Sequence, residues 1–246
     1  MNRTGRAPGG PGRPRAIAAA AAILAALAAR PQETDPFAAA RARMVETQIA
    51  ARGVSDPRVL AAMRKVERHL FVPETLRGEA YGDFPLPIGH GQTISQPYIV
   101  ALMTELARVR PGGRVLEIGT GTGYQAAILA ALAREVYSIE IVEPLAREAA
   151  DRLRRLGCRN VSVRAGDGYR GWPEKAPFDA ILVTAAPPRI PEPLLEQLAT
   201  GGRLVAPVGE EVQDLVLVEK TAQGLRRSRI APVRFVPMTG EVRERR

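Results

Sequence analysis

Polar side chains stand where several short apolar runs of this chain come to an end. They are Glu117, Glu140, Asp167 and Thr184. In an open α/β sheet, ligands bind beyond the carboxyl ends of the strands, so we expect these side chains to share one site. Carboxylates accept hydrogen bonds from hydroxyl and amine groups, which a nucleoside offers. The pattern therefore predicts a pocket for a nucleotide-like cofactor.

The most informative local stretch is residues 114–125, RVLEIGTGTGYQ. A short apolar run is followed there by closely spaced glycines and then by an Ala-rich helical pattern over 124–132. The glycines are Gly119, Gly121 and Gly123. Strand, glycine turn and helix is the geometry that brings backbone N–H groups close to a ligand. This stretch predicts the wall of the cofactor site, with the carboxylate of Glu117 at its mouth.

Two further acids suit an adenosyl group. Glu140 lies 19 residues after Gly121, where an acid can bond both hydroxyls of a ribose. Asp167 and Gly168 close the next predicted strand, and the carboxylate there could accept a hydrogen bond from the exocyclic amine of adenine. Together these positions outline an adenosyl site.

The glycines alone do not decide which adenosyl cofactor binds. Gly121, Gly123 and Ala126 satisfy the dinucleotide pattern, which keeps NAD as an alternative. Two features favour S-adenosyl-L-methionine. Glu117 is placed to organise a cationic, amine-bearing ligand, and the corner at residues 166–168 supplies an adenine partner that a pyrophosphate site does not need.

Apolar periodicity, glycines and prolines predict the elements that position these residues. We expect helices at about 38–51, 57–66, 96–108, 124–132, 143–156 and 191–199, strands at about 115–118, 135–140, 160–165, 178–184, 203–208, 213–220 and 226–236, and a long irregular loop over 71–94. The alternation of strands and helices predicts an α/β fold with a doubly wound, mainly parallel sheet, and the last two strands predict a C-terminal antiparallel β hairpin.

Composition narrows the function classes. The 246 residues are 46% hydrophobic, enough to bury a full core in one domain. The net charge is +9, but aromatic residues are only 4% and no long basic run is interleaved with them, so we expect no nucleic-acid partner. A single cysteine, Cys158, excludes an internal disulfide framework and a multi-cysteine metal site, and we expect no metal.

The first 36 residues differ from the rest and are expected to be an extension, either disordered or signal-like. Residues 1–15 are rich in Arg, Gly and Pro, and residues 16–29 form one Ala-rich apolar block. A basic start followed by a short apolar core imitates a secretory signal, but the block is shorter than the ~20 residues that span a bilayer. We expect a catalytic domain over 37–240 and a basic tail over 241–246.

Several motifs together resemble the protein-L-isoaspartate O-methyltransferase family. They are GQTISQP (91–97), VLEIGTGTGYQ (115–125), GDGY (166–169), DAILVTAAP (179–187) and VRFVPM (233–238). The glycine-rich stretch is shared by many methyltransferases, whereas GQTISQP and VTAAP are far more specific. The resemblance covers about residues 41–240 and implies a Rossmann-like class I methyltransferase fold.

The family implies transfer of a methyl group from S-adenosyl-L-methionine to the α-carboxyl of an L-isoaspartyl residue. Such residues arise when Asn deamidates or Asp isomerises through a succinimide. The methyl ester re-forms the succinimide, whose hydrolysis returns some normal aspartyl. The expected partners are therefore proteins and peptides that contain L-isoaspartyl residues, and the biological sense is protein repair.

The resemblance and the residue patterns together assign residues to roles. Ser95 matches the family's active-site serine. The expected cofactor contacts are Glu117, Gly119, Gly121, Gly123, Glu140, Asp167 and Gly168. The expected substrate contacts are Gln92, Thr93, Ile94, Ser95, Thr184, Ala185, Ala186, Val233 and Val236.

The implied reaction agrees with the residues present. A carboxylate has a reference pKa near ~4 and is already a nucleophile at neutral pH, so attack on a sulfonium methyl needs no general base. Catalysis would come from positioning and desolvation. Ser95 also has a structural alternative, because Ser before Gln96 and Pro97 is a good helix N-cap. One hydroxyl could serve both roles.

Three other functions remain as alternatives: a class I methyltransferase with a small-molecule or nucleic-acid substrate, an inactive cofactor-binding module, and an NAD oxidoreductase. We expect a cytoplasmic monomer without stable membrane association, because S-adenosyl-L-methionine is made in the cytosol. The alternative location is the periplasm, reached through the signal-like residues 1–28.

Overall fold

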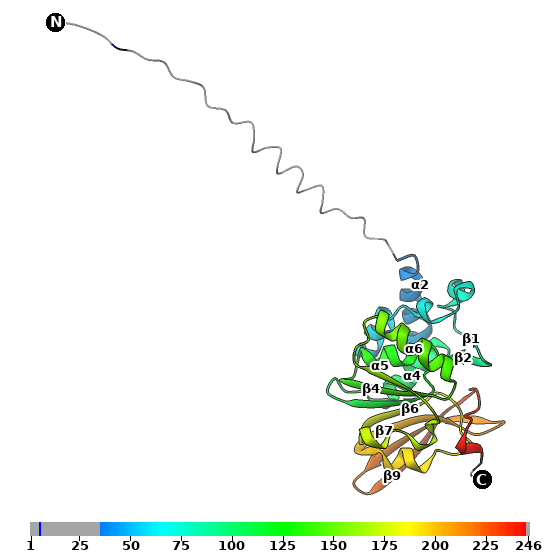
Figure 1. Ribbon diagram of the computed structural model, residues 1–246. Coiled ribbons are helices and arrows are strands. Elements are labelled where there is room, and N and C mark those ends of the chain that lie inside the picture. Colours follow the sequence, from blue (N-terminus) through cyan, green and yellow to red (C-terminus); the bar gives the residue numbers. More distant parts are fainter. Residues whose placement is uncertain (1–4, 6–34, 245–246) are drawn as a thin grey trace. The chain divides into compact units, whose positions relative to one another are not determined.

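The computed structural model describes residue 5 and residues 35–244 of the chain. The chain forms two units, Met1–Pro36 and Phe37–Arg246. The predicted extension over 1–36 therefore lies almost wholly outside the described residues. Figure 1 shows the helices and strands of the second unit, which carries every predicted site residue.

The centre of this unit is a seven-stranded sheet with the order β5-β4-β3-β6-β7-β8-β9. Its strands are β3 (Arg114–Ile118), β4 (Glu135–Glu140), β5 (Val161–Ala165), β6 (Phe178–Val183), β7 (Leu198–Val208), β8 (Gln213–Thr221) and β9 (Gly224–Val233). Strands β3 to β7 pair in parallel, and β8 and β9 add an antiparallel edge. The predicted doubly wound sheet with a C-terminal hairpin is confirmed.

The chain order of the strands reverses at β3. From β3 the chain winds outward through β4 to β5, and then returns to place β6 on the other side of β3. The carboxyl ends of β3 and β6 thus lie next to each other, with Ile118 paired to Val183. A doubly wound sheet opens a ligand crevice at such a switch point.

Helices cover both faces of the sheet. They are α2 (Ala38–Arg43), α3 (Pro57–Lys65), α4 (Pro97–Ala107), α5 (Tyr124–Ala130), α6 (Glu143–Arg155) and α7 (Glu192–Glu196). Helices α4, α5 and α6 lie together over one face (Figure 1). Among the described residues, no helix is long and apolar enough to span a bilayer.

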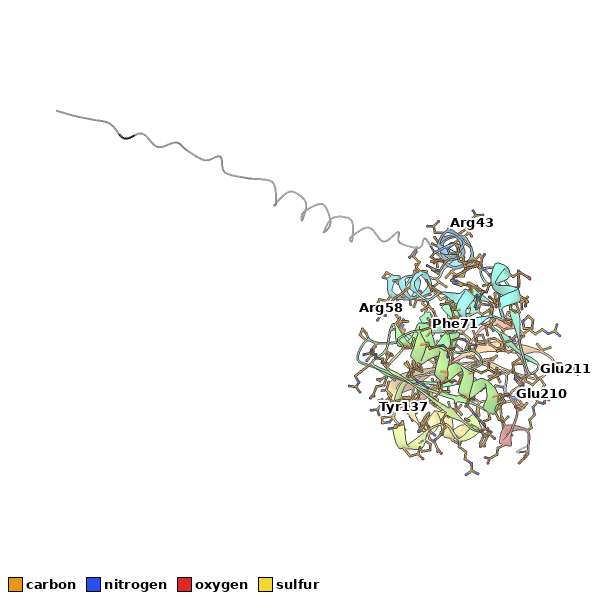
Figure 2. All side chains as sticks on the ribbon, turned by 45° about the horizontal axis from the view of Figure 1, so that its top comes forward. Arg43, Arg58, Phe71, Tyr137, Glu210 and Glu211 are labelled. Carbon is orange, nitrogen blue, oxygen red and sulfur yellow. The ribbon has the colours of Figure 1, made fainter. Side chains whose placement is uncertain are left out.

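Alternation along each strand divides the core into two clusters. Val115 packs in the cluster that includes α3, α4 and α5, whereas Leu116 and Ile118 pack in the cluster that includes α7. Glu117 follows the same alternation as Val115, so it is buried on the face covered by α4 and α5. Figure 2 shows Phe71 inside the molecule and the charged side chains of Arg43, Arg58 and Glu210 at its periphery.

The N-terminal helices start and stop close to where the sequence predicts. Helix α3 begins at Pro57, with the Asp56 carboxylate accepting a hydrogen bond from the N–H of Arg58. The predicted helix at 38–51 is α2 followed by a π-helix over Met44–Ile49 and a 3-10 turn, and Gly53 ends it in the left-handed conformation.

Three local predictions need correction. The loop over 71–94 is wrong in part, because it contains a small antiparallel hairpin of β1 (Leu86–Gly89) and β2 (Gln92–Ile94). Helix α7 is shorter than predicted because Leu198 already pairs in β7. The tail expected from residue 241 is folded over its first residues, since Val242 is buried.

Candidate active site

A cavity lies at the carboxyl edge of the sheet, at the switch point between β3 and β6. Its walls are the glycine turn after β3, the end of β4, the turn after β6, β2 and the segment near Val236. The predicted residues on its wall are Gln92, Thr93, Ile94, Ser95, Gly119, Gly121, Glu140, Gly168, Thr184, Ala185 and Val236. Its position at the switch point of a doubly wound sheet is where such folds bind small molecules and cofactors.

The glycine turn needs glycine for reasons that the backbone makes plain. Gly119 and Gly121 have φ of +99° and +53°, a region that side chains disfavour. A Cβ on Gly119 would overlap the hydroxyl of Thr184. Gly123 also has a positive φ, but a Cβ there would meet Leu153, and Gly123 does not line the cavity. Its predicted cofactor contact stays a prediction.

Glu140 faces the cavity with its carboxylate fixed in place. One oxygen accepts a hydrogen bond from the N–H of Gly121 (2.7 Å), and the other accepts from the N–H of Val142 (2.9 Å). Each oxygen retains a second lone pair. The side chain is only 5% exposed but lines the cavity, so its free lone pairs suit the hydroxyls of a ribose.

Glu117 lies fully buried, outside the cavity wall. It accepts a hydrogen bond from Ser138, its partner across the β3–β4 ladder, and the Ser138 hydroxyl also pairs with Thr120 at 2.6 Å. The second carboxylate oxygen, Oε1, has no partner among the described residues. Burial raises the pKa of Glu117 to about 8, with the nearby charge of Glu140 adding to the shift and the Ser138 hydrogen bond opposing it.

Asp167 has a different environment from the one predicted. Its Oδ1 accepts from the N–H of Tyr169 (2.8 Å) and its Oδ2 accepts from the N–H of Glu241 (2.7 Å). The carboxylate thus joins the end of β5 to the C-terminal segment, and it does not line the cavity. Gly168 does line it. The adenine contact of Asp167 stays a prediction.

The turn after β6 joins the site to the fold. The Thr184 hydroxyl lies 2.6 Å from the carbonyl of Gly119 and 3.0 Å from that of Ile118, to which it can donate, so it locks the turn to the glycine stretch. Ala186 is fully buried and exchanges backbone hydrogen bonds with Val236 and Met238, so it shapes the site without lining the cavity.

A second hollow, which we call the groove, opens beside the cavity. Its lining includes Val233 and the segment up to Pro237 on one side, and the start of α4 on the other. The cavity and the groove share Thr93, Ser95, Thr184, Val236 and Pro237. A molecule in the cavity and one in the groove would therefore meet at these residues.

Ser95 does not act as the helix cap that the sequence allows. The N-cap position of α4 belongs to Gln96, and no side chain caps the helix there. Gln96 instead donates to the carbonyl and the carboxylate of Asp83. The Ser95 hydroxyl has no hydrogen bond among the described residues and lines both the cavity and the groove.

Sequence reasoning did not single out several residues of the site. Thr120 and Thr122, between the glycines, line the cavity, and Ser138 holds Glu117. A polar residue in the middle of an otherwise buried strand was the available signal for Ser138. Nothing in the local sequence pointed to Arg52 or Tyr98, which reach the groove only through the fold.

The cavity fits a cofactor that combines a ribose with a charged amine. The unpaired Oε1 of Glu117 and the unpaired hydroxyl of Thr122 are buried polar atoms without partners among the described residues, and the glycines allow close backbone approach. Within the described part of the chain, no cluster of His, Cys, Asp and Glu could hold a metal ion.

Comparison with known proteins decides the family. A family model described as protein-L-isoaspartate(D-aspartate) O-methyltransferase matches residues 39–243. The chain belongs to the protein-L-isoaspartate O-methyltransferase family. This confirms the resemblance and, with it, the expected methyl transfer to isoaspartyl residues and the dependence on S-adenosyl-L-methionine.

Individual members of the protein-L-isoaspartate O-methyltransferase family are close to this chain. The enzyme of that name from a Synechococcus species is 62% identical over 216 residues, which cover 85% of this chain and 88% of that protein. The Picosynechococcus enzyme is 59% identical over 206 residues, covering 84% of this chain and 93% of that protein.

Solved structures of the family agree in fold. One protein-L-isoaspartate O-methyltransferase superposes with a TM-score of 0.74 at 32% identity, covering 82% of this chain and 67% of that one. A Plasmodium falciparum chain assigned to the same enzyme class, in complex with S-adenosyl-L-homocysteine, gives 0.71 at 28% identity, covering 81% and 98%.

Proposed function

We propose that this chain methylates the α-carboxyl of L-isoaspartyl residues in damaged proteins and peptides, with S-adenosyl-L-methionine as methyl donor, and thereby starts their repair to normal aspartyl. The domain that does so is 37–240, extended by the folded residues that follow it. One observation carries the residue-level proposal: the cavity and the groove meet at Ser95 and Thr184.

The cavity is the cofactor site in this proposal. Glu140 accepts hydrogen bonds from the ribose hydroxyls through the lone pairs that Gly121 and Val142 leave free. Glu117 offers the unpartnered Oε1 of its carboxyl group to the amine end, and Gly119 and Gly121 allow close backbone approach. When bound, S-adenosyl-L-methionine supplies an electrophilic methyl group on a sulfonium.

The groove holds the peptide so that the free α-carboxyl of its isoaspartyl residue points to Ser95 and Thr184, where the groove meets the cavity. Ser95, which has a free hydroxyl there, donates a hydrogen bond to the substrate carboxylate and orients it. The carboxylate is the nucleophile in its ordinary ionised form, so the chain needs no general base. Orientation of two bound reactants can contribute roughly 7–11 kcal/mol to such a reaction.

The first test is methyl transfer from radiolabelled S-adenosyl-L-methionine to a synthetic isoaspartyl peptide and to its normal aspartyl twin. We expect base-labile label on the isoaspartyl peptide only. Binding of S-adenosyl-L-homocysteine, measured by calorimetry, separates the two parts of the proposal. If the ligand binds and neither peptide is labelled, the substrate assignment fails and the cofactor assignment stands.

The proposal also covers the cellular location and the oligomeric state of the enzyme. We propose a cytoplasmic monomer, because the cofactor is made in the cytosol and one chain supplies both the cavity and the groove. Cell fractionation with mass spectrometry of the mature N-terminus tests the location, and a terminus at Ala29 would mean export. Light scattering of the purified chain tests the oligomeric state.

A further inference from the structure

The described lining of the groove carries positive charge and no negative charge. Among its described lining residues are two arginines, Arg52 and Arg234, and no carboxylate. The remaining lining is apolar or neutral, with Tyr98 and Phe235 among it. Because the groove is where the substrate peptide lies in our proposed function, its charge acts on the residues that flank the isoaspartyl.

The positive charge of Arg52 is already compensated by a carboxylate. Its Nη1 forms an ion pair with Asp83 at 3.0 Å, and its guanidinium lies 3.5 Å from the ring centroid of Tyr98. Asp83 in turn accepts a hydrogen bond from Gln96. This side of the groove therefore presents a fixed, nearly neutral group to a peptide.

The positive charge of Arg234 is not compensated by any described residue. Its guanidinium has no hydrogen bond or ion pair with any described residue, and the residue is exposed. Acids of the neighbouring strand and loop are bonded elsewhere: Asp214 pairs with Arg229 at 2.7 Å, and Glu210 approaches Arg243 at 3.4 Å. The groove thus carries one guanidinium without a described partner.

The backbone under Arg234 is held from both sides. The Gln213 side chain accepts a hydrogen bond from the N–H of Phe235 (2.6 Å) and donates to its carbonyl (3.1 Å). One residue further, the carbonyl of Val236 accepts from the N–H of Ala186 (2.8 Å). The Arg234 Cα is therefore fixed beside the groove, and only its side chain is free to turn toward a ligand.

We propose that Arg234 is a specificity-determining residue that favours isoaspartyl peptides with an acidic residue beside the damaged position. This rests on the proposed function of the groove. A carboxylate on the peptide would pair with the guanidinium, whereas a lysine there would be repelled. Because the pair is exposed, the effect is about two- to fivefold in kcat/KM, carried by KM, and declines with added salt.

The test uses isoaspartyl peptides that differ at one flanking position, in two series, one for the residue before the isoaspartyl and one for the residue after it. Each series has Glu, Gln or Lys at that position. In at least one series we expect kcat/KM to fall in the order Glu, Gln, Lys at low salt, with the differences shrinking at 0.5 M NaCl. Equal values for all three peptides in both series, or the opposite order, would overturn the inference.

Variants assign the effect to Arg234. Arg234→Gln should bring the three peptides to nearly equal KM while kcat for the Gln peptide stays unchanged, and Arg234→Glu should reverse the order. Arg159→Gln is the matched control, because this exposed arginine precedes β5 at the opposite edge of the sheet. A preference that persists in Arg234→Gln would place its origin elsewhere. Lack of any label on the Gln peptide with wild type would instead refute the proposed function.

Discussion

Replacement of Glu117 by Gln should stabilise the cofactor-free protein, and more so at higher pH. Glu117 is fully buried, and burial raises its pKa from 4.5 to about 8. The folded chain therefore keeps a proton that the unfolded chain has released, over the window between these two values. Wild-type stability must fall as the pH rises through that window and then level off above about pH 8.

The magnitude follows from the two pKa values. At 1.36 kcal/mol per unit, the burial of Glu117 costs about 1 kcal/mol at pH 5.5 and about 4 kcal/mol at pH 8. Glu117→Gln removes the charge while its amide oxygen can still accept the hydrogen bond of Ser138. The free energy of unfolding of the variant relative to wild type should thus rise by about 3 kcal/mol between pH 5.5 and pH 8.

Urea denaturation of both proteins at the two pH values measures this difference. Glu148→Gln is the matched control, since Glu148 is an exposed carboxylate on α6, and its difference from wild type should be the same at both pH values. A Glu117→Gln difference that is constant with pH, or that shrinks at pH 8, would refute the reasoning. Calorimetry should show weaker binding of S-adenosyl-L-homocysteine to the stabilised variant, because an amide N–H₂ replaces the unpartnered Oε1 acceptor of Glu117.

Three other substitutions test the site. Ser95→Ala should lower kcat/KM for an isoaspartyl peptide about ten- to a hundredfold, because one hydrogen bond to a charged group is lost. The free energy of unfolding in urea should change by less than about 0.5 kcal/mol, since Ser95 does not cap α4. A large loss of stability would restore a capping role. Asp167→Asn should lower the free energy of unfolding by about 1–3 kcal/mol, because an amide N–H₂ would face a backbone N–H of Tyr169 or Glu241. An unchanged midpoint of thermal unfolding would contradict this. Gly121→Ala should lower the free energy of unfolding by about 1–2 kcal/mol, since the φ of this residue is +53°. It should also weaken the binding of S-adenosyl-L-homocysteine. Equal affinity in calorimetry would show that this glycine is not needed for close approach of the backbone to the ligand.

The sequence by itself was sufficient to predict the mainly parallel sheet and a cavity at its carboxyl edge. Apolar runs alternating with helical patterns predicted parallel strands, and parallel strands bring their carboxyl ends to one edge of the sheet. Glu140 and the glycine turn could therefore be assigned to one pocket from the sequence alone. Their chemistry depends on residue type and strand position, which are local properties of the sequence.

The tertiary structure decided which predicted residues face the cavity. Asp167 stands at a strand end like Glu140, yet its two oxygens accept backbone N–H groups from Tyr169 and Glu241, the latter 74 residues away. Ser95 has the local sequence of a cap, yet Gln96 takes that position and bonds to Asp83. Partners distant in the chain decide these outcomes, and no local pattern contains them.

The substrate groove was beyond sequence reasoning for the same physical reason. It forms between the start of α4 and the segment after β9, which come together only when the sheet is complete. Whether Arg52 or Arg234 carries a free charge depends on Asp83 reaching one and no described acid reaching the other. The sequence determined the fold and the chemistry that the site could use, and tertiary contacts decided which side chains are left free to use it.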